Sequence, residues 1–150
     1  MRVLACLLLV LATGCFGASR QERRYFVLHM GPTGTGLGAI IPGLVRVRNL
    51  DSESTYDKFQ IVVRRNPYEL NYRETDVWAV KPNRMVSDSL ARRLQEYGLF
   101  SGVTRELGEQ RPDYSLGGDL HAIELYDSGD RLYAHLSMTL TSPVRKFARV

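Results

Sequence analysis

The chain has 150 residues, 44% hydrophobic and 24% charged, a balance that excludes a disordered chain and an integral membrane protein and fits one folded domain. The formal net charge is +4, and the basic residues are scattered among acids without the aromatic and glycine signature of nucleic-acid modules, so we expect no nucleic acid partner. A mildly basic surface suits either plain solvation, the simpler interpretation, or contact with anionic headgroups.

The first fifteen residues are arranged like an export signal. An unbroken apolar run covers residues 3–12 and is too short for a bilayer-spanning helix, which needs about 20 apolar residues. The small residues Thr13 and Gly14 directly precede Cys15, which resembles the lipobox of bacterial lipoproteins. The alternative is an ordinary signal peptide with a cysteine nearby by chance, because Ala12 stands where Leu is commonest in a lipobox.

The lipobox interpretation fixes the expected domain organisation. We predict a signal peptide over residues 1–14, lipid on Cys15, a polar tether over residues 15–24 and a single domain over residues 25–150. Each buried CH2 contributes about 0.8 kcal/mol, so several acyl chains would hold the protein stably at a membrane. Phe16 follows the cysteine where Asp would favour inner-membrane retention, so we expect the periplasmic face of the outer membrane.

The first half of the domain is expected to be rich in strands. Residues 31–43 are rich in glycine and proline but lack the spacing of a phosphate-binding loop, so a connector is favoured over a nucleotide site. Aromatic, β-branched or alternating residues indicate the strands. The expected strands are Tyr25–His29, Leu44–Arg48, Phe59–Val63 and Tyr68–Tyr72, the last two forming a hairpin.

One helix is predicted from about residue 82 to residue 97. Pro82 suits the first turn, Gly98 suits the stop, and apolar residues recur on one face. That apolar stripe comprises Val86, Leu90, Leu94 and Tyr97, and with Trp78 it is expected at the centre of the core.

Three more strands are predicted after the helix. A short one is predicted over Val103–Leu107, and a longer one lies within residues 113–126, where Gly117-Gly118 suggests a bulge or a close backbone approach. Apolar residues then alternate strictly from Leu132 to Leu140, which predicts a half-buried strand. The expected fold is therefore α/β, more closely α+β, with a mixed, largely antiparallel sheet and the helix packed on one face.

No residue pattern demands catalysis or a cofactor. The histidines are far apart and lack metal-site spacing, and neither a nucleophile elbow nor a cysteine nucleophile is present in the mature domain. Acids near the last strands are expected to be surface charges. We therefore predict no catalytic residue, no cofactor and no metal site. The residues considered are His29, His121, His135, Asp113, Asp119 and Glu124.

The order of several short motifs carries a resemblance to a known family. After the lipobox come Tyr25-Phe-Val-Leu, Phe59-Gln-Ile-Val-Val-Arg, Trp78 before Leu90-Ala-Arg-Arg-Leu, and Pro112-Asp-Tyr-Ser-Leu before a long strand hairpin. This order resembles the ABC-type transport auxiliary lipoprotein family, of the paraquat-inducible protein C type, over roughly Cys15 to Leu140.

The resemblance implies a fold, a role and partners. It implies a domain like the N-terminal domain of the TolB type, anchored by lipid on Cys15. It also implies a non-enzymatic docking component of an ABC-type MCE lipid transport system, with an MCE-domain protein as partner and a homo-oligomeric ring as the assembly. Family members usually continue with another strand and a C-terminal helix. Because this chain stops at Val150, we expect either loss of that helix or a truncated frame, and an uncovered sheet face that favours association.

Two other functions stay open. An outer-membrane lipoprotein of this size could itself bind lipid or lipopolysaccharide as a carrier or assembly factor, which would need an apolar cavity. A periplasmic hydrolase is the third hypothesis, although the sequence presents no nucleophile, base or metal set for it.

Overall fold

The computed structural model describes residues 21–31 and 41–142. Within these ranges the chain forms one helix and eight strands, so it is an α+β protein as expected. The strands are β1 (Arg24–Phe26), β2 (Ile41–Val47), β3 (Asp51–Ser52), β4 (Gln60–Asn66), β5 (Glu69–Trp78), β6 (Phe100–Thr104), β7 (Tyr114–Asp127) and β8 (Leu132–Thr141), and the helix is α2 (Pro82–Glu96).

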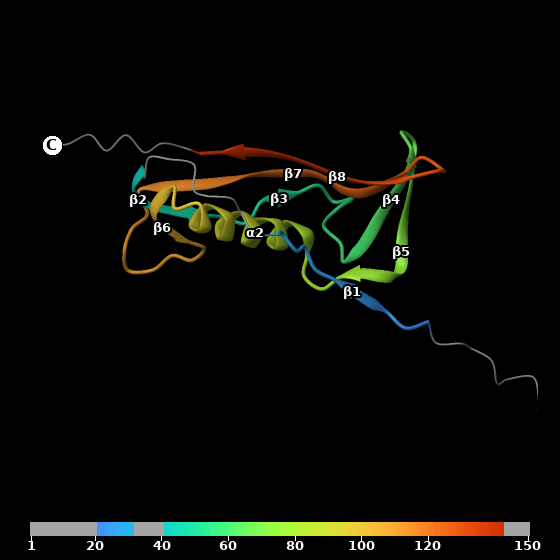
Figure 1. Cartoon of the computed structure of the whole chain (residues 1–150), viewed down its shortest axis with the longest axis horizontal. Coiled ribbons are helices and arrows are strands. Elements are labelled where there is room, and N and C mark those ends of the chain that lie inside the picture. Colours follow the sequence, from blue (N-terminus) through green and yellow to red (C-terminus); the bar gives the residue numbers. More distant parts are fainter. Residues whose placement is uncertain (1–20, 32–40, 143–150) are drawn as a thin grey trace, which may run out of the picture.

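The strand β7 is the centre of the sheet. One of its edges pairs with β8 along residues 117–127, and its other edge pairs in succession with β2, β3 and β4. The main path of the sheet runs β1-β5-β4-β7-β2-β6. The β4–β5 hairpin turns away from the direction of β7 and β8, so the sheet is strongly curled (Figure 1).

The prediction of a mixed sheet is confirmed, but its largely antiparallel character is wrong. Only β4–β5 and β7–β8 are antiparallel, and the other five strand pairs are parallel. The two antiparallel pairs are hairpins, which local sequence indicates well. The parallel pairs join strands far apart in the chain, and the alternation of side chains within one strand does not reveal its partner.

The helix α2 begins and ends where the sequence predicts. Pro82 occupies the first turn, and Gly98 follows the helix with a φ of 62°, a left-handed conformation that favours glycine. The buried face differs in part from the predicted stripe, because it comprises Pro82, Met85, Val86, Ser87 and Ala91. Leu90, Leu94 and Tyr97 are only half-buried.

The buried Ser87 fastens the helix to the loop between β2 and β3. Its hydroxyl donates to the carbonyl of Asn83 at 2.6 Å and accepts the backbone N–H of Leu50 at 2.9 Å. The side-chain amide of Asn83 donates to the carbonyl of Leu50 at 3.2 Å. The hydroxyl of Ser87 therefore both donates and accepts a hydrogen bond inside the core, although hydropathy alone would place a serine at the surface.

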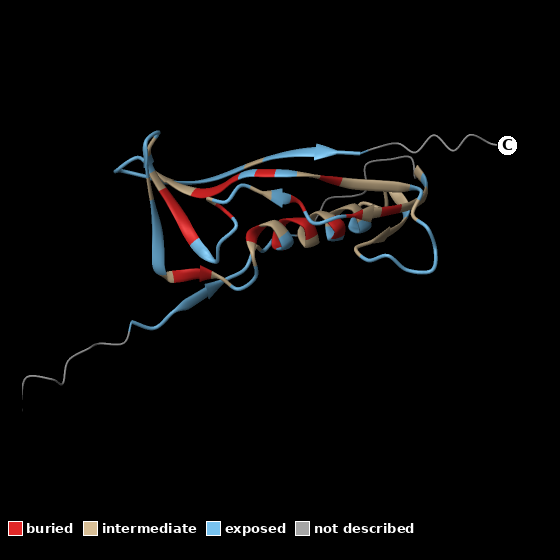
Figure 2. Ribbon diagram, turned by 180° about the vertical axis from the view of Figure 1, so that it is seen from behind, coloured by how far each residue is buried: buried red, intermediate tan, exposed pale blue. Residues whose placement is uncertain are grey.

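The core lies between α2 and the middle of the sheet. Figure 2 shows buried residues concentrated on the helix and on β4, β5 and β7. Trp78, predicted at the centre, is only partly buried and packs at the margin of this cluster. The cluster comprises Leu50, Tyr56, Val62, Met85, Val86, Leu120, Ala122 and Ile123.

Two glycines permit the close pairing of β7 with its neighbours. Gly118 has a φ of 140°, and a Cβ there would collide with the backbone carbonyl of Thr139 on β8. A Cβ at Gly117 would overlap the guanidinium group of Arg48. The predicted close approach at these glycines is confirmed, whereas the register shift of the hairpin lies further on, between Leu120 and Ala122.

Candidate functional site

The predicted lipidation site lies outside the described residues. Cys15, the signal peptide over residues 1–14 and most of the tether over residues 15–24 precede residue 21, where the description begins. Most of the glycine-rich connector and the last eight residues also lie outside it. The candidate site in the described residues is therefore a surface feature of the folded domain.

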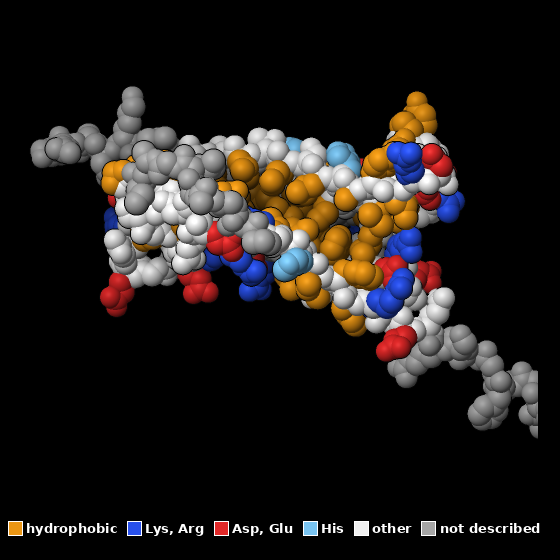
Figure 3. Space-filling model, in the orientation of Figure 1, with side chains coloured by type: hydrophobic (Ala, Val, Ile, Leu, Met, Phe, Trp, Pro, Cys, Tyr) orange, Lys and Arg blue, Asp and Glu red, His pale blue; other side chains and the backbone are white. Residues whose placement is uncertain are grey.

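An apolar groove opens on the face of the sheet that carries the helix. It has a volume of about 430 Å³, which is within the range of small-molecule sites. Figure 3 shows the apolar side chains gathered in a hollow near the middle of this face. The groove is lined by Phe26, Val27, Leu28, His29, Ile61, Arg73, Asp76, Trp78, Ile123, Glu124, Leu125, Ala134, His135 and Leu136.

The groove exists because α2 leaves part of the sheet uncovered. Leu136 on β8 stands opposite Ile123 on β7, and Ala134 stands opposite Leu125, so these side chains share one face. Leu136 is 46% exposed, whereas Ile123 is 7% exposed. The alternation predicted for β8 is present, but its predicted half-burial is wrong, because nearly every residue of β8 is exposed (Figure 2).

The other wall of the groove is the chain that follows β1. The backbone N–H of Ala79 donates to the carbonyl of Phe26 at 2.8 Å, and that of Leu28 points at the sulfur of Met85 at 3.1 Å. Arg24 adds a bidentate ion pair to the buried Asp76, with Nε and Nη2 at 2.8 and 3.0 Å from its two oxygens. The wall is therefore fixed to β5 and α2 rather than lying loosely on them.

A buried carboxylate, Glu124, stands at the side of the groove. Nε of Arg64 donates to both carboxylate oxygens at 2.9 and 3.0 Å, and the hydroxyl of Tyr56 donates to Oε2 at 2.6 Å. Nδ1 of His135, opposite on β8, is 3.0 Å from Oε1. Nη2 of Arg64 also donates to the Tyr56 hydroxyl at 3.0 Å, which closes the network.

The network holds Glu124 in its ionised form. Burial alone would raise its pKa, but the hydrogen bonds from Arg64, Tyr56 and His135 outweigh burial and hold the pKa below its usual value. Burial, together with the hydrogen bond to Glu124, raises the pKa of Tyr56. A carboxylate with both oxygens engaged by donors is a poor general base, so the arrangement suits structure rather than proton transfer.

The three acids considered in the sequence differ in their exposure to solvent. Asp113 and Asp119 are exposed as expected, but the expectation of a surface charge is wrong for Glu124, which is 5% exposed. The sequence did offer a sign of this burial, because Glu124 lies between the apolar residues Ile123 and Leu125 of one strand. An acid buried in such a run needs hydrogen-bond partners. The partners come from Arg64 and Tyr56, sixty and sixty-eight residues earlier, which spacing does not reveal.

The histidines do not come together. His29 lines the groove, His135 contacts Glu124, and His121 contacts Thr139 through Nε2 at 2.8 Å. In residues 21–31 and 41–142, no group of three or more His, Cys, Asp or Glu side chains is placed to bind a metal ion. Over the same ranges, no helix has the length and apolar character needed to span a bilayer.

Solved structures with the same fold are known. Protein XCC0632 from Xanthomonas campestris, of family DUF330, matches with a TM-score of 0.65 and 22% identity, covering 84% of this chain and 68% of its own. An uncharacterised protein matches with a TM-score of 0.56 and 10% identity, covering 85% and 84%. At these identities the likeness concerns the fold alone. A comparison with curated proteins finds no match.

The family assignment rests on sequence. The family model described as the ABC-type transport auxiliary lipoprotein component matches residues 26–146, which include every strand from the end of β1 onward and the helix. This match agrees with the order of motifs in the sequence, from the first strand to the final hairpin. The chain therefore belongs to the family of ABC-type transport auxiliary lipoprotein components.

Proposed function

We propose that this lipoprotein is a non-enzymatic docking component of an ABC-type MCE lipid transport system. The observation that carries the proposal is the family match over residues 26–146. The Glu124 network supports a structural role, since its carboxylate is engaged by three donors. In this proposal the domain, similar to the N-terminal domain of the TolB type, joins an MCE-domain protein to a membrane.

Membership of a lipoprotein family implies attachment to a membrane of the cell envelope. We propose that residues 1–14 are removed, that lipid on Cys15 provides the attachment, and that Phe16 directs the protein to the periplasmic face of the outer membrane. Metabolic labelling with a palmitate analogue should label the wild type and Cys6→Ala but not Cys15→Ala. Equal labelling of all three would contradict the anchor.

Docking is tested by affinity purification. A tagged chain, purified from detergent-solubilised envelopes of its host, should recover an MCE-domain protein, and Cys15→Ala should recover much less because it leaves the membrane. Recovery of no MCE-domain protein with the wild type would contradict the proposal.

The homo-oligomeric ring is tested separately. Light scattering of the purified lipoprotein should give the mass of a ring of copies, whereas a monomer mass would exclude the ring.

A second candidate function, a lipid carrier, is favoured by the apolar groove. Its volume of about 430 Å³ and largely apolar lining suit an acyl chain. Phospholipid that co-purifies with the chain should be lost in Leu136→Asp, which places a charge in the groove. It should be retained in Leu132→Asp, since Leu132 lies on the same strand, is 58% exposed and does not line the groove. Equal retention in both would exclude the carrier.

A further inference from the structure

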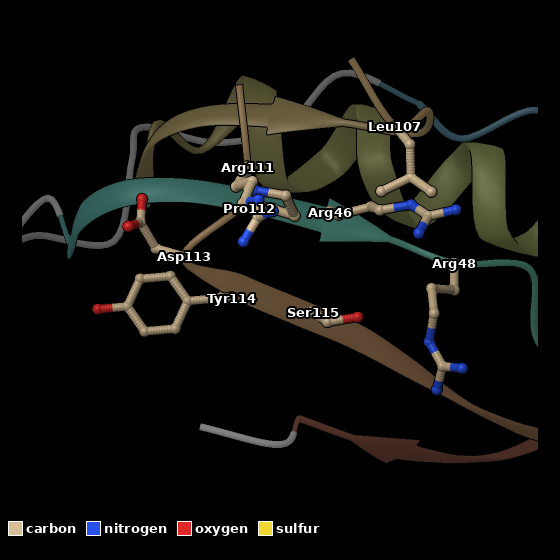
Figure 4. A pocket seen from close by; sticks show the side chains of 8 residues that line it. All are labelled: Arg46, Arg48, Leu107, Arg111, Pro112, Asp113, Tyr114 and Ser115. Atoms are coloured by element: carbon tan, nitrogen blue, oxygen red, sulfur yellow. The ribbon is translucent and has the colours of Figure 1, made fainter. Parts of the chain in front are cut away.

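A second pocket lies on the opposite face of the sheet. Its volume is about 600 Å³, and it is formed by β2, the start of β7 and the loop before β7 (Figure 4). Arg46 and Arg48 alternate along β2 with the fully buried Val45 and Val47, so they project from the face remote from the core. The lining comprises Arg46, Arg48, Leu107, Arg111, Pro112, Asp113, Tyr114 and Ser115.

The three arginines of this pocket have no partners. Arg46, Arg48 and Arg111 make no hydrogen bond or ion pair with any residue that the structure describes. Nε of Arg46 is fully buried and has no acceptor. Most buried polar atoms in proteins have a partner, so this guanidinium group is an exception that a bound acceptor would explain.

Most of the other described arginines differ from these three. Eight have an acidic partner within 4.0 Å, so ion pairing is the common state for arginine in this fold. The paired arginines are Arg24, Arg64, Arg65, Arg73, Arg84, Arg93, Arg105 and Arg131. Arg23 and Arg92 also lack an ion pair with a described residue, but they lie apart from the pocket, whereas Arg46, Arg48 and Arg111 line one site.

The single acid in the pocket is already engaged. Oδ2 of Asp113 accepts the backbone N–H of Leu44 at 2.8 Å, and the N–H of Asp113 donates to the carbonyl of Leu44 at 2.9 Å. These two bonds fix the loop that carries Arg111 against β2. Gly117 lets the guanidinium group of Arg48 lie against β7, because any side chain there would overlap it. The arginines are therefore positioned by the backbone around them.

We infer that this pocket binds a phosphate group carried by a larger molecule. Guanidinium groups match phosphate oxygens with paired donors, and three of them favour a ligand with more than one acceptor oxygen. Ser115 stands beside Arg46 in the register of β2 and β7 and adds a hydroxyl donor. A volume of about 600 Å³ exceeds the size of one ion, so the pocket has room for a substituent on the phosphate. The inference does not depend on the docking role.

The experiment measures binding to the purified full-length lipoprotein in non-ionic detergent. The probes are inorganic phosphate, glycerol phosphate, dihexanoyl phosphatidylglycerol and dihexanoyl phosphatidylcholine. Titration calorimetry measures the affinity of each. Arg46→Gln/Arg48→Gln should lower the affinity roughly tenfold or more, because charge-assisted contacts are lost. The matched control Arg23→Gln/Arg92→Gln removes two exposed arginines outside the pocket and should bind like the wild type.

The outcomes separate the sources of the phosphate. Tight binding of phosphatidylglycerol alone identifies a lipid headgroup, whereas equal binding of glycerol phosphate identifies a soluble phosphate ester; loss in the pocket variant supports the site in both cases. Arg111 lies on an exposed loop, so Arg111→Gln should fold even if the double variant does not, and it should also weaken binding. No binding of any probe by the wild type, or an equal loss in the control variant, would overturn the inference. Failure of the docking role alone would leave this binding unchanged.

Discussion

The neighbouring strands β7 and β8 both carry apolar residues along their length, but these residues have different environments. On β7, Leu120 is fully buried beneath α2, while its partner on β8, Met138, is 39% exposed. The difference arises from coverage, since the helix packs over the middle of the sheet and β8 lies beyond it (Figure 1). Alternation therefore tells which residues share a face, and only the arrangement of elements tells whether that face is buried.

The largest difference between the strands should appear on truncation of leucine. Leu120→Ala should lower the free energy of unfolding by about 3 kcal/mol, because it opens a cavity under the helix. Leu136→Ala on β8 should lower it by less than about 1 kcal/mol, because that side chain is half-exposed. Urea denaturation followed by circular dichroism measures both. Similar losses would show that the face of β8 is covered in solution.

A smaller loss is expected where β7 and β8 approach most closely. Gly118→Ala should lower the free energy of unfolding by about 2 kcal/mol, since its Cβ would meet the carbonyl of Thr139 and its φ of 140° is unfavourable for alanine. Gly129→Ala in the turn is the matched control, with a φ of 91° but open space around its Cβ. A loss as large in Gly129→Ala would assign the effect to backbone conformation alone.

Breaking the Glu124 network should lower the free energy of unfolding by a comparable or slightly smaller amount. Glu124→Gln should lower the free energy of unfolding at pH 7 by about 2 kcal/mol, because Arg64 loses its charged partner in a partly buried site. Asp119→Asn, an exposed acid on the same strand, should change it by less than about 0.5 kcal/mol. Thermal unfolding of both variants under identical conditions provides the comparison.

The smallest effect is the dependence of that stability on pH. The folded pKa of Glu124 is lowered, so its contribution is full above the unfolded pKa of about 4.3 and is lost as pH falls through the folded pKa. The wild type should therefore lose stability in this acid range more steeply than Glu124→Gln. Chemical denaturation at a series of pH values between about 5 and 3 checks this. Parallel curves would contradict a lowered pKa.

Local features of this fold could be predicted from the sequence, whereas the partners of buried polar groups could not. Pro82 and Gly98 set the ends of α2, and the two hairpins follow from turn residues between alternating runs. These signals act over a few residues. The bonds of Glu124 to Tyr56 and Arg64 join distant parts of the chain, so no short pattern contains them.

The arginine pocket shows the same limit in another form. The alternation of Arg46 and Arg48 with buried valines correctly indicates that the two arginines lie on the face of the strand away from the core. Their place in one pocket with Arg111 depends on the parallel pairing of β2 with β7, which places the loop before β7 beside them. The pairing was the part of the sheet that the sequence left undetermined, and the pocket was missed for that reason.

The position of β7 has a consequence for how the molecule assembles. Among the described strands, the pair β2–β6 and the group β1–β5–β4 are joined by hydrogen bonds only through β7, which begins at Tyr114. Contacts between residues so distant form slowly, because the intervening chain must first be closed into loops. The sheet is therefore completed only when the final quarter of the polypeptide, which begins with β7, is available to pair with both groups of strands.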